Sequence, residues 1–444
     1  MSELVAARRK KLEALRKQGI NPFPAKSART HTTKQSLKEP LGTVVTVAGR
    51  IKAWRSHGGS VFADLEDGSG RIQVLFKKDE LGKAFEILEQ FDLGDFIEVR
   101  GVVFETSTKQ KTVGATSVSL LTKTLHPVPE KRAGLKDHEE RHRRRYLDLM
   151  TNPETRHIFE LRAKIISSMR HFLYLNGYLE VETPILQPVY GGTLARPFTT
   201  HHNELKQDLY LRISNELYLK RLVVGGFEKV YEIGRDFRNE GISTTHNPEF
   251  TFMETMCAYA DYKDNMNFVE EMLRAIAKDV LGKLTFTYQA HTIDLSIWSK
   301  VEHPGTQAEF EAREKEWIQP TIVHDFPLEG SPLAKRSLTK PNRVERFEVF
   351  IGGLELMNVY SELNDPDELR THFKEQALLR KEGDLDAHPT DEDFIEALAY
   401  GMPPTSGVGV GIDRLVMLFT NASSIRDVIL FPALKLKKRH ETGK

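Results

Sequence analysis

Alternation of apolar and polar residues dominates the chain between residues 44 and 121. A spacing of two residues is typical of strands that bury one face. Five such segments occur, and an amphipathic helical pattern separates the third from the fourth. The expected strands begin at Val44 and cover residues 61–65, 72–76, 96–104 and 112–121. Five short strands with a helix after the third predict a small OB-type β-barrel over residues 41–126, an architecture that often binds nucleic acid.

The pattern becomes α+β beyond residue 150. Pro153 stands at the first position of an amphipathic helix that Gly177 ends. Two alternating segments, 229–233 and 250–254, predict a hairpin, and another helix follows it. Three further strand-like segments come next, at 321–325, 346–358 and 407–411. The sequence therefore predicts a second, α+β domain over residues 151–434.

Two stretches lack either period. Residues 1–40 are predicted to be a basic helix with a linker, and residues 127–150 a second, polar linker. Lys+Arg and Asp+Glu both number 63, but basic residues gather in the first 30 residues, at 141–145 and in the tail 435–444. Such runs are either solvated faces or basic arms that steer RNA, and the sequence leaves both open.

Composition restricts the class of protein. Cys257 is the only cysteine, which excludes an intramolecular disulfide and a cysteine-rich zinc site. No apolar stretch approaches the roughly 18 residues of a membrane helix, and the N-terminus lacks the apolar segment of a signal peptide. We expect a cytoplasmic protein with no membrane partner.

The hairpin carries a candidate nucleotide clamp. Arg238 can hold a phosphate in bidentate fashion, Glu240 can accept from an exocyclic amine, and Phe250 can stack on a purine. An ordinary charged hairpin tip is the alternative. Gly407, Gly409 and Gly411 precede Arg414, and this spacing permits close backbone approach to a phosphate.

Two acids and a polar stretch accompany the clamp. Glu348 and Glu355 suit Mg²⁺, which prefers oxygen ligands; exposed strand carboxylates are the alternative. Residues 358–365 are dense in hydrogen-bonding groups, typical of a small polar ligand's site or simply of a polar loop. Together these features indicate an adenylate-forming site, in which the protein positions reactants and stabilises charge.

These residues resemble the class II lysyl-tRNA synthetases of the bacterial and eukaryotic type over nearly the whole chain. Thr183-Pro184, Phe237–Phe250 and Gly407–Arg414 are similar to the three class II motifs. Residues 212–220, 331–335 and 361–365 are similar to stretches of the lysine enzymes. The resemblance implies an OB-fold anticodon-binding domain and a catalytic domain built on an antiparallel sheet flanked by helices. It also implies ATP, lysine and tRNA as partners, Mg²⁺ as cofactor, and a homodimer.

The resemblance also implies roles for individual residues. Arg238 and Arg414 would be catalytic and hold ATP phosphates, and Glu348 and Glu355 would bind Mg²⁺. The remaining ATP contacts would be Glu240, His246 and Phe250. The amino acid would meet Gly192, Glu216, Arg238, Met256, Asn358, Tyr360 and Glu362, with Glu216 and Gly192 at the α-amino group and Glu362 at the ε-ammonium group. Arg55, Phe62 and Gln110 would contact the anticodon.

Some positions depart from the family. Met256 stands where the family has a tyrosine near the lysine ammonium, and Met357 and Val359 replace small residues beside Asn358. Gln110 replaces a glutamate of the barrel, and the insertion near 283–317 is shortened. Three alternatives therefore stay open: a paralogue that adenylates another amino acid or loads another acceptor, a non-catalytic RNA-binding relative, and an aspartate or asparagine enzyme.

Overall fold

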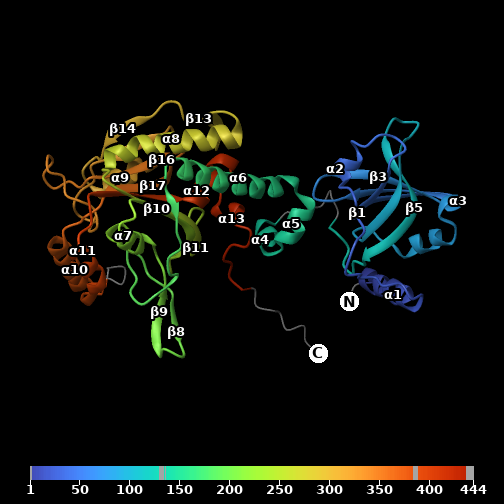
Figure 1. Cartoon of the computed structure of the whole chain (residues 1–444), viewed down its shortest axis with the longest axis horizontal. Helices are drawn as coiled ribbons and strands as arrows, with labels where there is room; N and C mark the ends of the chain where they lie inside the picture. The colour runs from blue at the N-terminus through green and yellow to red at the C-terminus, as the bar shows by residue number, and fades with distance from the viewer. Residues whose placement is uncertain (1–2, 130–134, 136, 384–388, 437–444) are drawn as a thin grey trace. The chain divides into compact units, whose positions relative to one another are not determined.

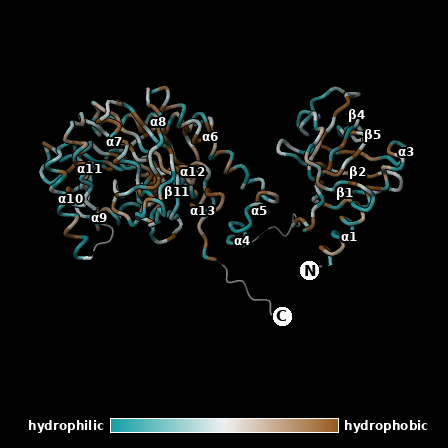
Figure 2. Tube along the Cα trace, turned by 60° about the horizontal axis from the view of Figure 1, so that its bottom comes forward, coloured by the Kyte–Doolittle hydropathy of each residue, from teal (hydrophilic) through white to brown (hydrophobic). Residues whose placement is uncertain are grey.

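The computed structural model describes residues 3–129, 135, 137–383 and 389–436, and the end of the basic tail lies outside them. The chain divides into two compact units, residues 1–134 and 135–444 (Figure 1). Hydrophobic segments gather in the interior of each unit (Figure 2). No described helix is long and apolar enough to cross a membrane.

The first unit is a closed barrel with strand order β1-β2-β3-β5-β4. Its strands are β1 (Val44–His57), β2 (Ser60–Glu66), β3 (Arg71–Lys77), β4 (Phe96–Glu105) and β5 (Lys111–Thr122). Alternate apolar residues of all five fill the interior, so the predicted OB-type barrel is confirmed. Between β3 and β4 the expected helix consists of a short α3 (Lys78–Leu81) and a 3₁₀ segment, η1 (Gly82–Gln90).

The N-terminal helix α1 (Glu3–Lys17) packs on the barrel. Leu15 is fully buried in the barrel core, and Arg8 donates hydrogen bonds to Thr124 and to the carbonyl of His126, at 2.7 and 3.1 Å. The segment predicted to be a linker contains the short helix α2 (Thr33–Ser36), which a capping box at Thr32 stabilises. Residues 3–40 therefore belong to the barrel unit.

The second unit is built on an eight-stranded sheet with the order β14-β15-β16-β17-β18-β11-β10-β6. Neighbours are antiparallel except at β14–β15 and β10–β6. Its strands are β6 (Leu179–Glu180), β10 (Lys229–Phe237), β11 (Glu249–Ala258), β14 (Ser299–Glu302), β15 (Thr321–His324), β16 (Arg346–Ile351), β17 (Leu354–Ser361) and β18 (Thr405–Gly411). This largely antiparallel sheet confirms the predicted α+β class.

Helices cover the sheet. The helices α6 (Pro153–Leu175), α8 (Tyr262–Leu281) and α12 (Ile412–Thr420) bury their apolar faces against one side of it, and α6 and α8 lie next to each other (Figure 1). A smaller cluster joins α7 (Glu216–Val224), α10 (Pro366–Lys381) and α11 (Glu392–Ala399). The remaining elements are a sheet of β7 (Leu186–Gln187), β8 (Thr199–His202) and β9 (Gln207–Leu211), and the helix α13 (Ile425–Val428).

Residues 127–150 were predicted to be a polar linker, but the structure has helices in the second half of this segment. Two helices form there, α4 (His138–Arg143) and α5 (Arg145–Thr151). The basic run at 141–145 lies in them and is engaged within the protein: Arg145 is buried, pairs with Asp148 at 2.8 Å and donates to the carbonyls of Arg426, Ile429 and Leu430. The role of Arg145 is structural, because these bonds tie α5 to α13 and to the segment that follows it.

The shortened insertion is ordered. Residues 283–317 contain the hairpin of β12 (Thr285–Tyr288) and β13 (His291–Asp294), the edge strand β14, the helix α9 (Gln307–Arg313) and a 3₁₀ turn, η2 (Glu314–Glu316). Phe310 of α9 and Trp317 are buried in a local aromatic cluster. The segment therefore closes one edge of the sheet.

Candidate active site

The strand register assigns the site to one face of the sheet. In the central strands, Asn358 pairs with Gly409, which pairs with Glu254 on its other side; Tyr360, Gly407 and Met256 are matched in the same way. Cross-strand partners share a face. Two strands therefore contribute side chains, and β18 between them contributes glycines. A Cβ on residue 409 would lie 3.0 Å from the ring of Phe252, so the floor of the site requires the absence of side chains there.

A cavity of about 330 Å³ lies over this face. It is lined by all the residues predicted to bind ATP and by both predicted metal ligands: Arg238, Glu240, His246, Phe250, Arg414, Glu348 and Glu355. The hairpin of β10 and β11, the hairpin of β16 and β17, and α12 converge here from distant parts of the sequence.

Arg414 is held in place from two directions. Its guanidinium donates to the carbonyl of Glu355 at 2.8 Å and to a carboxylate oxygen of the same residue at 3.0 Å. It also lies 3.0 Å from Nε2 of His246. Burial lowers the pKa of His246, and the positive charge of Arg414 lowers it further, so the imidazole is neutral and accepts the bond. The result is a fixed positive charge at the cavity wall.

Arg238 lies over the ring of Phe250, with its guanidinium carbon 5.0 Å from the ring centroid. Its Nε makes a long contact, 3.4 Å, with the carbonyl of Ile213. This arrangement suits a nucleotide, because the guanidinium group can bind a phosphate and the aromatic ring can stack on a base.

The two predicted metal ligands each have an arginine neighbour. Arg346 donates to Glu348, and Arg414 to Glu355. Burial raises the pKa of Glu348 to about 8, and the nearby carboxylate of Glu355 adds to the increase. Among the described residues no group of three or more acidic, histidine or cysteine side chains could hold a metal alone. The pair fits a cation shared with substrate phosphates.

A second cavity, of about 60 Å³, adjoins the first. Every residue predicted to contact the amino acid lines it: Gly192, Glu216, Arg238, Met256, Asn358, Tyr360 and Glu362. A Cβ on residue 192, where φ is +96°, would lie 2.6 Å from the hydroxyl of Ser214, so only glycine fits this wall.

Glu362 and Glu216 are buried and share a cation that the sequence reasoning missed. Lys220, 1% exposed, ion-pairs with Glu216 at 2.6 Å and with Oε2 of Glu362. The hydroxyl of Tyr360 donates to the second oxygen of Glu216 at 2.5 Å. The signal in the sequence was the spacing: residues four apart on α7 lie on one helix face.

Glu254 is a second residue that the sequence reasoning missed. It lines the smaller cavity, and only one of its oxygens has a partner, the hydroxyl of Ser214 at 2.9 Å. Burial raises the pKa of Glu254 well above its ordinary value, and the neighbouring carboxylates of Asp236 and Glu216 raise it further. The alternation of side chains along β11 could have indicated Glu254, because Phe250, Phe252 and Glu254 are two residues apart and therefore lie on one face of the strand.

Asn358 is oriented by Arg346. The Nε of Arg346 donates to Oδ1 of Asn358 at 3.0 Å, and its NH1 donates to Ser331 at 2.8 Å. Because the amide oxygen is engaged, the amide nitrogen of Asn358 is left to donate toward the cavity. This polarity suits a carboxylate ligand.

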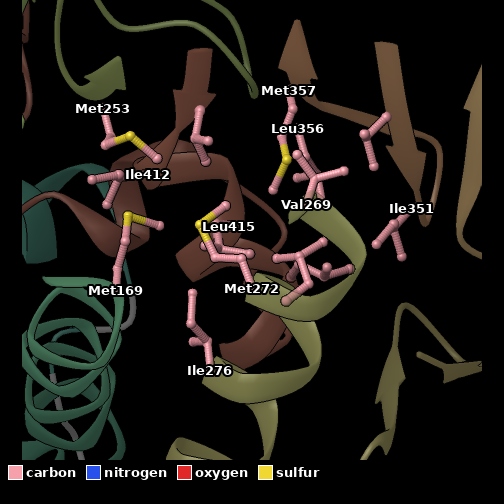
Figure 3. Close-up of a cluster of buried hydrophobic side chains, with 14 of the residues drawn as sticks. Met169, Met253, Val269, Met272, Ile276, Ile351, Leu356, Met357, Ile412 and Leu415 are labelled. Carbon is pink, nitrogen blue, oxygen red and sulfur yellow. The ribbon is translucent and has the colours of Figure 1, made fainter. Parts of the chain in front are cut away.

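Met357 and Val359 flank Asn358 in the sequence but do not line the amino-acid cavity. Their side chains lie on the opposite face of β17, inside the main core, where Figure 3 shows Met357 among Met169, Val269 and Leu415. The alternation of the strand is the reason, since neighbours of Asn358 must point away from it. Met256 does line the pocket, with Sδ 3.0 Å from where a Cβ on residue 407 would lie.

The three residues predicted for the anticodon lie on the barrel unit. Arg55 and Phe62 are direct cross-strand partners on β1 and β2, and Arg55 pairs with Asp64 at 2.8 Å. Gln110 is exposed in the turn that precedes β5. An exposed arginine beside a partly exposed aromatic ring offers a stacking surface.

Comparisons with known proteins identify the family to which both units are related. Residues 137–435 match the family described as tRNA synthetases class II (D, K and N), and residues 45–121 match the OB-fold nucleic acid binding domain. The chain is similar to the lysine–tRNA ligases of Pelotomaculum thermopropionicum, Carboxydothermus hydrogenoformans and Bacillus subtilis, each 47% identical. These alignments cover 98% of this chain and 95%, 98% and 98% of the relatives. They run over 482, 480 and 488 positions, more than the 444 residues of this chain, so the relatives contain segments without a counterpart here.

Proposed function

The chain belongs to the class II tRNA synthetases of the D, K and N type, and from that premise we propose that it activates lysine with ATP and transfers it to the 3′ end of its tRNA. In the first step, a carboxylate oxygen of lysine attacks the α-phosphorus of ATP and pyrophosphate leaves. In the second, a terminal ribose hydroxyl of the tRNA attacks the carbonyl carbon of the adenylate, and AMP leaves. Because the charged tRNA is consumed in translation, we propose the cytoplasm as its compartment.

One observation carries the choice of lysine. Glu362 is 1% exposed, lines the smaller cavity, and leaves Oε1 without a side-chain partner, although the backbone N–H of Gly407 lies close to this carboxylate. An unpartnered buried carboxylate oxygen is costly unless a ligand supplies the donor. The ε-ammonium group of lysine supplies both a donor and a positive charge, whereas a neutral donor leaves the carboxylate charge unbalanced and an ionised acidic side chain repels it.

The second free oxygen serves the other ammonium group. Oε2 of Glu254, on β11, is also buried and unpartnered, and Glu254 lines the same cavity. We propose that it joins Glu216 at the α-ammonium group, while Asn358 and Arg238 meet the carboxylate. Lysine is then held at three charged points, which fixes the attacking oxygen next to the larger cavity.

The larger cavity suits ATP. Phe250 supplies a face for the adenine, Glu240 and His246 flank it, and the guanidinium groups of Arg238 and Arg414 supply positive charge for the phosphates. Charge that develops on the α-phosphate in the transition state is stabilised by these fixed cations, which do not need to reorganise.

Mg²⁺ is part of the proposal. Glu348 and Glu355 would hold it together with ATP phosphates, and when bound it supplies positive charge to the phosphate oxygens. The raised pKa of Glu348 supports this, because two nearby carboxylates without an added cation resist ionising together.

The barrel unit is the proposed anticodon reader. Phe62 offers a ring for base stacking, and Arg55 and Gln110 offer hydrogen bonds. The match of this unit to an OB-fold nucleic acid binding domain supports the assignment.

A homodimer is also proposed. Tyr174 and Leu175 at the end of α6 are 74% and 68% exposed, and Leu179 on the edge strand β6 is 47% exposed. Tyr174 and Leu179 border a groove of about 640 Å³ that Arg170, Tyr178 and Tyr231 also line. Exposed apolar residues beside an open strand edge are typical of an interface between copies of a chain.

Met256 favours one alternative. Its thioether, rather than a hydroxyl, lies beside Glu362, so an amino acid with a bulkier or less polar end could compete with lysine. ATP–pyrophosphate exchange with each amino acid in turn decides between them. Exchange with lysine alone is expected; exchange with another amino acid and not lysine identifies a paralogue, and exchange with none identifies a non-catalytic relative.

A further inference from the structure

Lys220 lies behind the amino-acid cavity, between two carboxylates of its wall. Its ammonium group pairs with Oε1 of Glu216 at 2.6 Å and with Oε2 of Glu362. The side chain is 1% exposed. Burial lowers the pKa of Lys220, but the attraction of the two carboxylates outweighs burial and raises it, so the group stays charged.

This ion pair determines which oxygens face the cavity. One oxygen of Glu216 is engaged by Lys220 and the other by the hydroxyl of Tyr360. Glu362 gives one oxygen to Lys220, and Glu254 gives one to Ser214. Among the glutamates that line the described part of the cavity, the oxygens left without a side-chain partner in this arrangement are Oε1 of Glu362, which lies near the backbone of Gly407, and Oε2 of Glu254.

We propose that Lys220 is a specificity-determining positioning residue, whose ammonium group occupies one oxygen of Glu216 and one of Glu362 so that the cavity presents two free carboxylate oxygens to the two ammonium groups of lysine. This rests on the proposed activation of lysine. Lys220 does not contact the reacting atoms; it acts through the two carboxylates.

The charge balance gives the reason for a built-in cation. With lysine bound, three ammonium groups meet three carboxylates, those of Glu216, Glu254 and Glu362. Burial raises the pKa of Glu362 to about 8, with the ammonium group of Lys220 lowering it and the carboxylate of Glu216 raising it. Without Lys220 the two buried like charges would oppose each other unscreened, and Glu362 would hold its proton more firmly against an incoming ammonium group. A protonated Glu362 no longer discriminates a charged amino-acid end from an apolar one.

The test is Lys220→Met, which keeps the length of the side chain and removes its charge. Lys123→Met is the matched control: Lys123 is also fully buried and bridges two acids, Asp92 and Asp95, but in the barrel unit. Exchange kinetics are measured for lysine, for ATP and for norleucine, which has the same carbon chain without the ε-ammonium group. We expect Lys220→Met to raise the KM for lysine by about tenfold or more and to reduce the preference for lysine over norleucine by about tenfold, with the KM for ATP unchanged. Lys123→Met should change neither.

The outcomes separate two failures. No exchange with lysine in the wild-type protein contradicts the proposed function itself. Normal wild-type exchange with an unchanged lysine preference in folded Lys220→Met overturns the role of Lys220 alone, as does an equal rise in both KM values. If that variant does not fold, a crystal structure of the wild-type protein with lysine decides: Lys220 is expected to stay paired with both carboxylates, and its departure from Glu362 overturns the proposal.

Discussion

Oε1 of Glu362 lies 2.5 Å from the point that a Cβ on Gly407 would occupy. The same Cβ would lie 2.9 Å from the terminal methyl of Met256. The carboxylate can reach its position only because β18 has no side chain there, which makes this glycine part of the amino-acid site.

Gly407→Ala should therefore weaken lysine binding more than ATP binding. The added methyl group displaces Glu362 or Met256, and we expect the KM for lysine to rise by about tenfold or more, as for overpacking of a tight site. Exchange kinetics measure both constants. Gly68→Ala, at a turn with open space around it, is the control for a general effect of the substitution; an unchanged lysine KM in Gly407→Ala would contradict this reading.

Glu362→Gln tests the charge itself. The amide keeps the shape but cannot balance an ammonium group, so the KM for lysine should rise by about a hundredfold while the KM for ATP changes less than about twofold. Glu396→Gln, on the exposed side of α11, should behave as wild type. Equal losses for both substrates would mean that Glu362 is a structural residue.

Lysine binding should depend on pH through Glu254. The pKa of Glu254 is raised in the free protein, so the group is protonated below that pKa and must lose its proton to receive an ammonium group. Affinity should therefore increase with rising pH, by up to about tenfold per unit, until the raised pKa is reached. The groups that face Glu254 are Asp236 and Glu232 on β10, Glu216 on α7, Tyr360 on β17 and Arg238.

Calorimetry between pH 6 and 8 in buffers of different ionisation enthalpy measures both the affinity and the released proton. Glu254→Gln is expected to remove one of the protons released and to flatten the pH dependence, leaving the share of Glu362, whose pKa burial raises to about 8. Persistence of the full pH dependence and proton release in that variant would assign them to another group.

If the chain forms the proposed dimer, a charged residue introduced at the exposed end of α6 should weaken the association of the two copies. Leu175→Glu places a charge in the apolar surface beside β6, so it should convert a dimer to a monomer, measured by light scattering during size-exclusion chromatography. Leu378→Glu, at a residue 59% exposed on α10, is the control and should leave the mass unchanged. A wild-type protein that elutes as a monomer would refute the dimer directly.

The sequence determined much of the fold, because strand alternation is a local pattern. The five strands of the barrel, the hairpin of β10 and β11, and the glycines of β18 followed from spacing alone. The start of α6 at Pro153 followed from the backbone chemistry of proline. Residues 138–151 were missed because short, charged helices leave no long apolar stripe, and their stability comes from distant partners such as the carbonyl of Leu430.

For the site, the sequence determined which chemistries are present, since Arg238, Arg414, Glu348 and Glu362 lie in recognisable motifs. Only the tertiary structure decided which of their atoms are available. Strand parity turned Met357 and Val359 into the core and Glu254 toward the cavity. Lys220 met Glu362 across a large separation in the chain. Burial makes this ion pair important, because water does not reach the carboxylate oxygen to replace Lys220 as its partner. Breaking the pair would therefore leave a buried charge uncompensated.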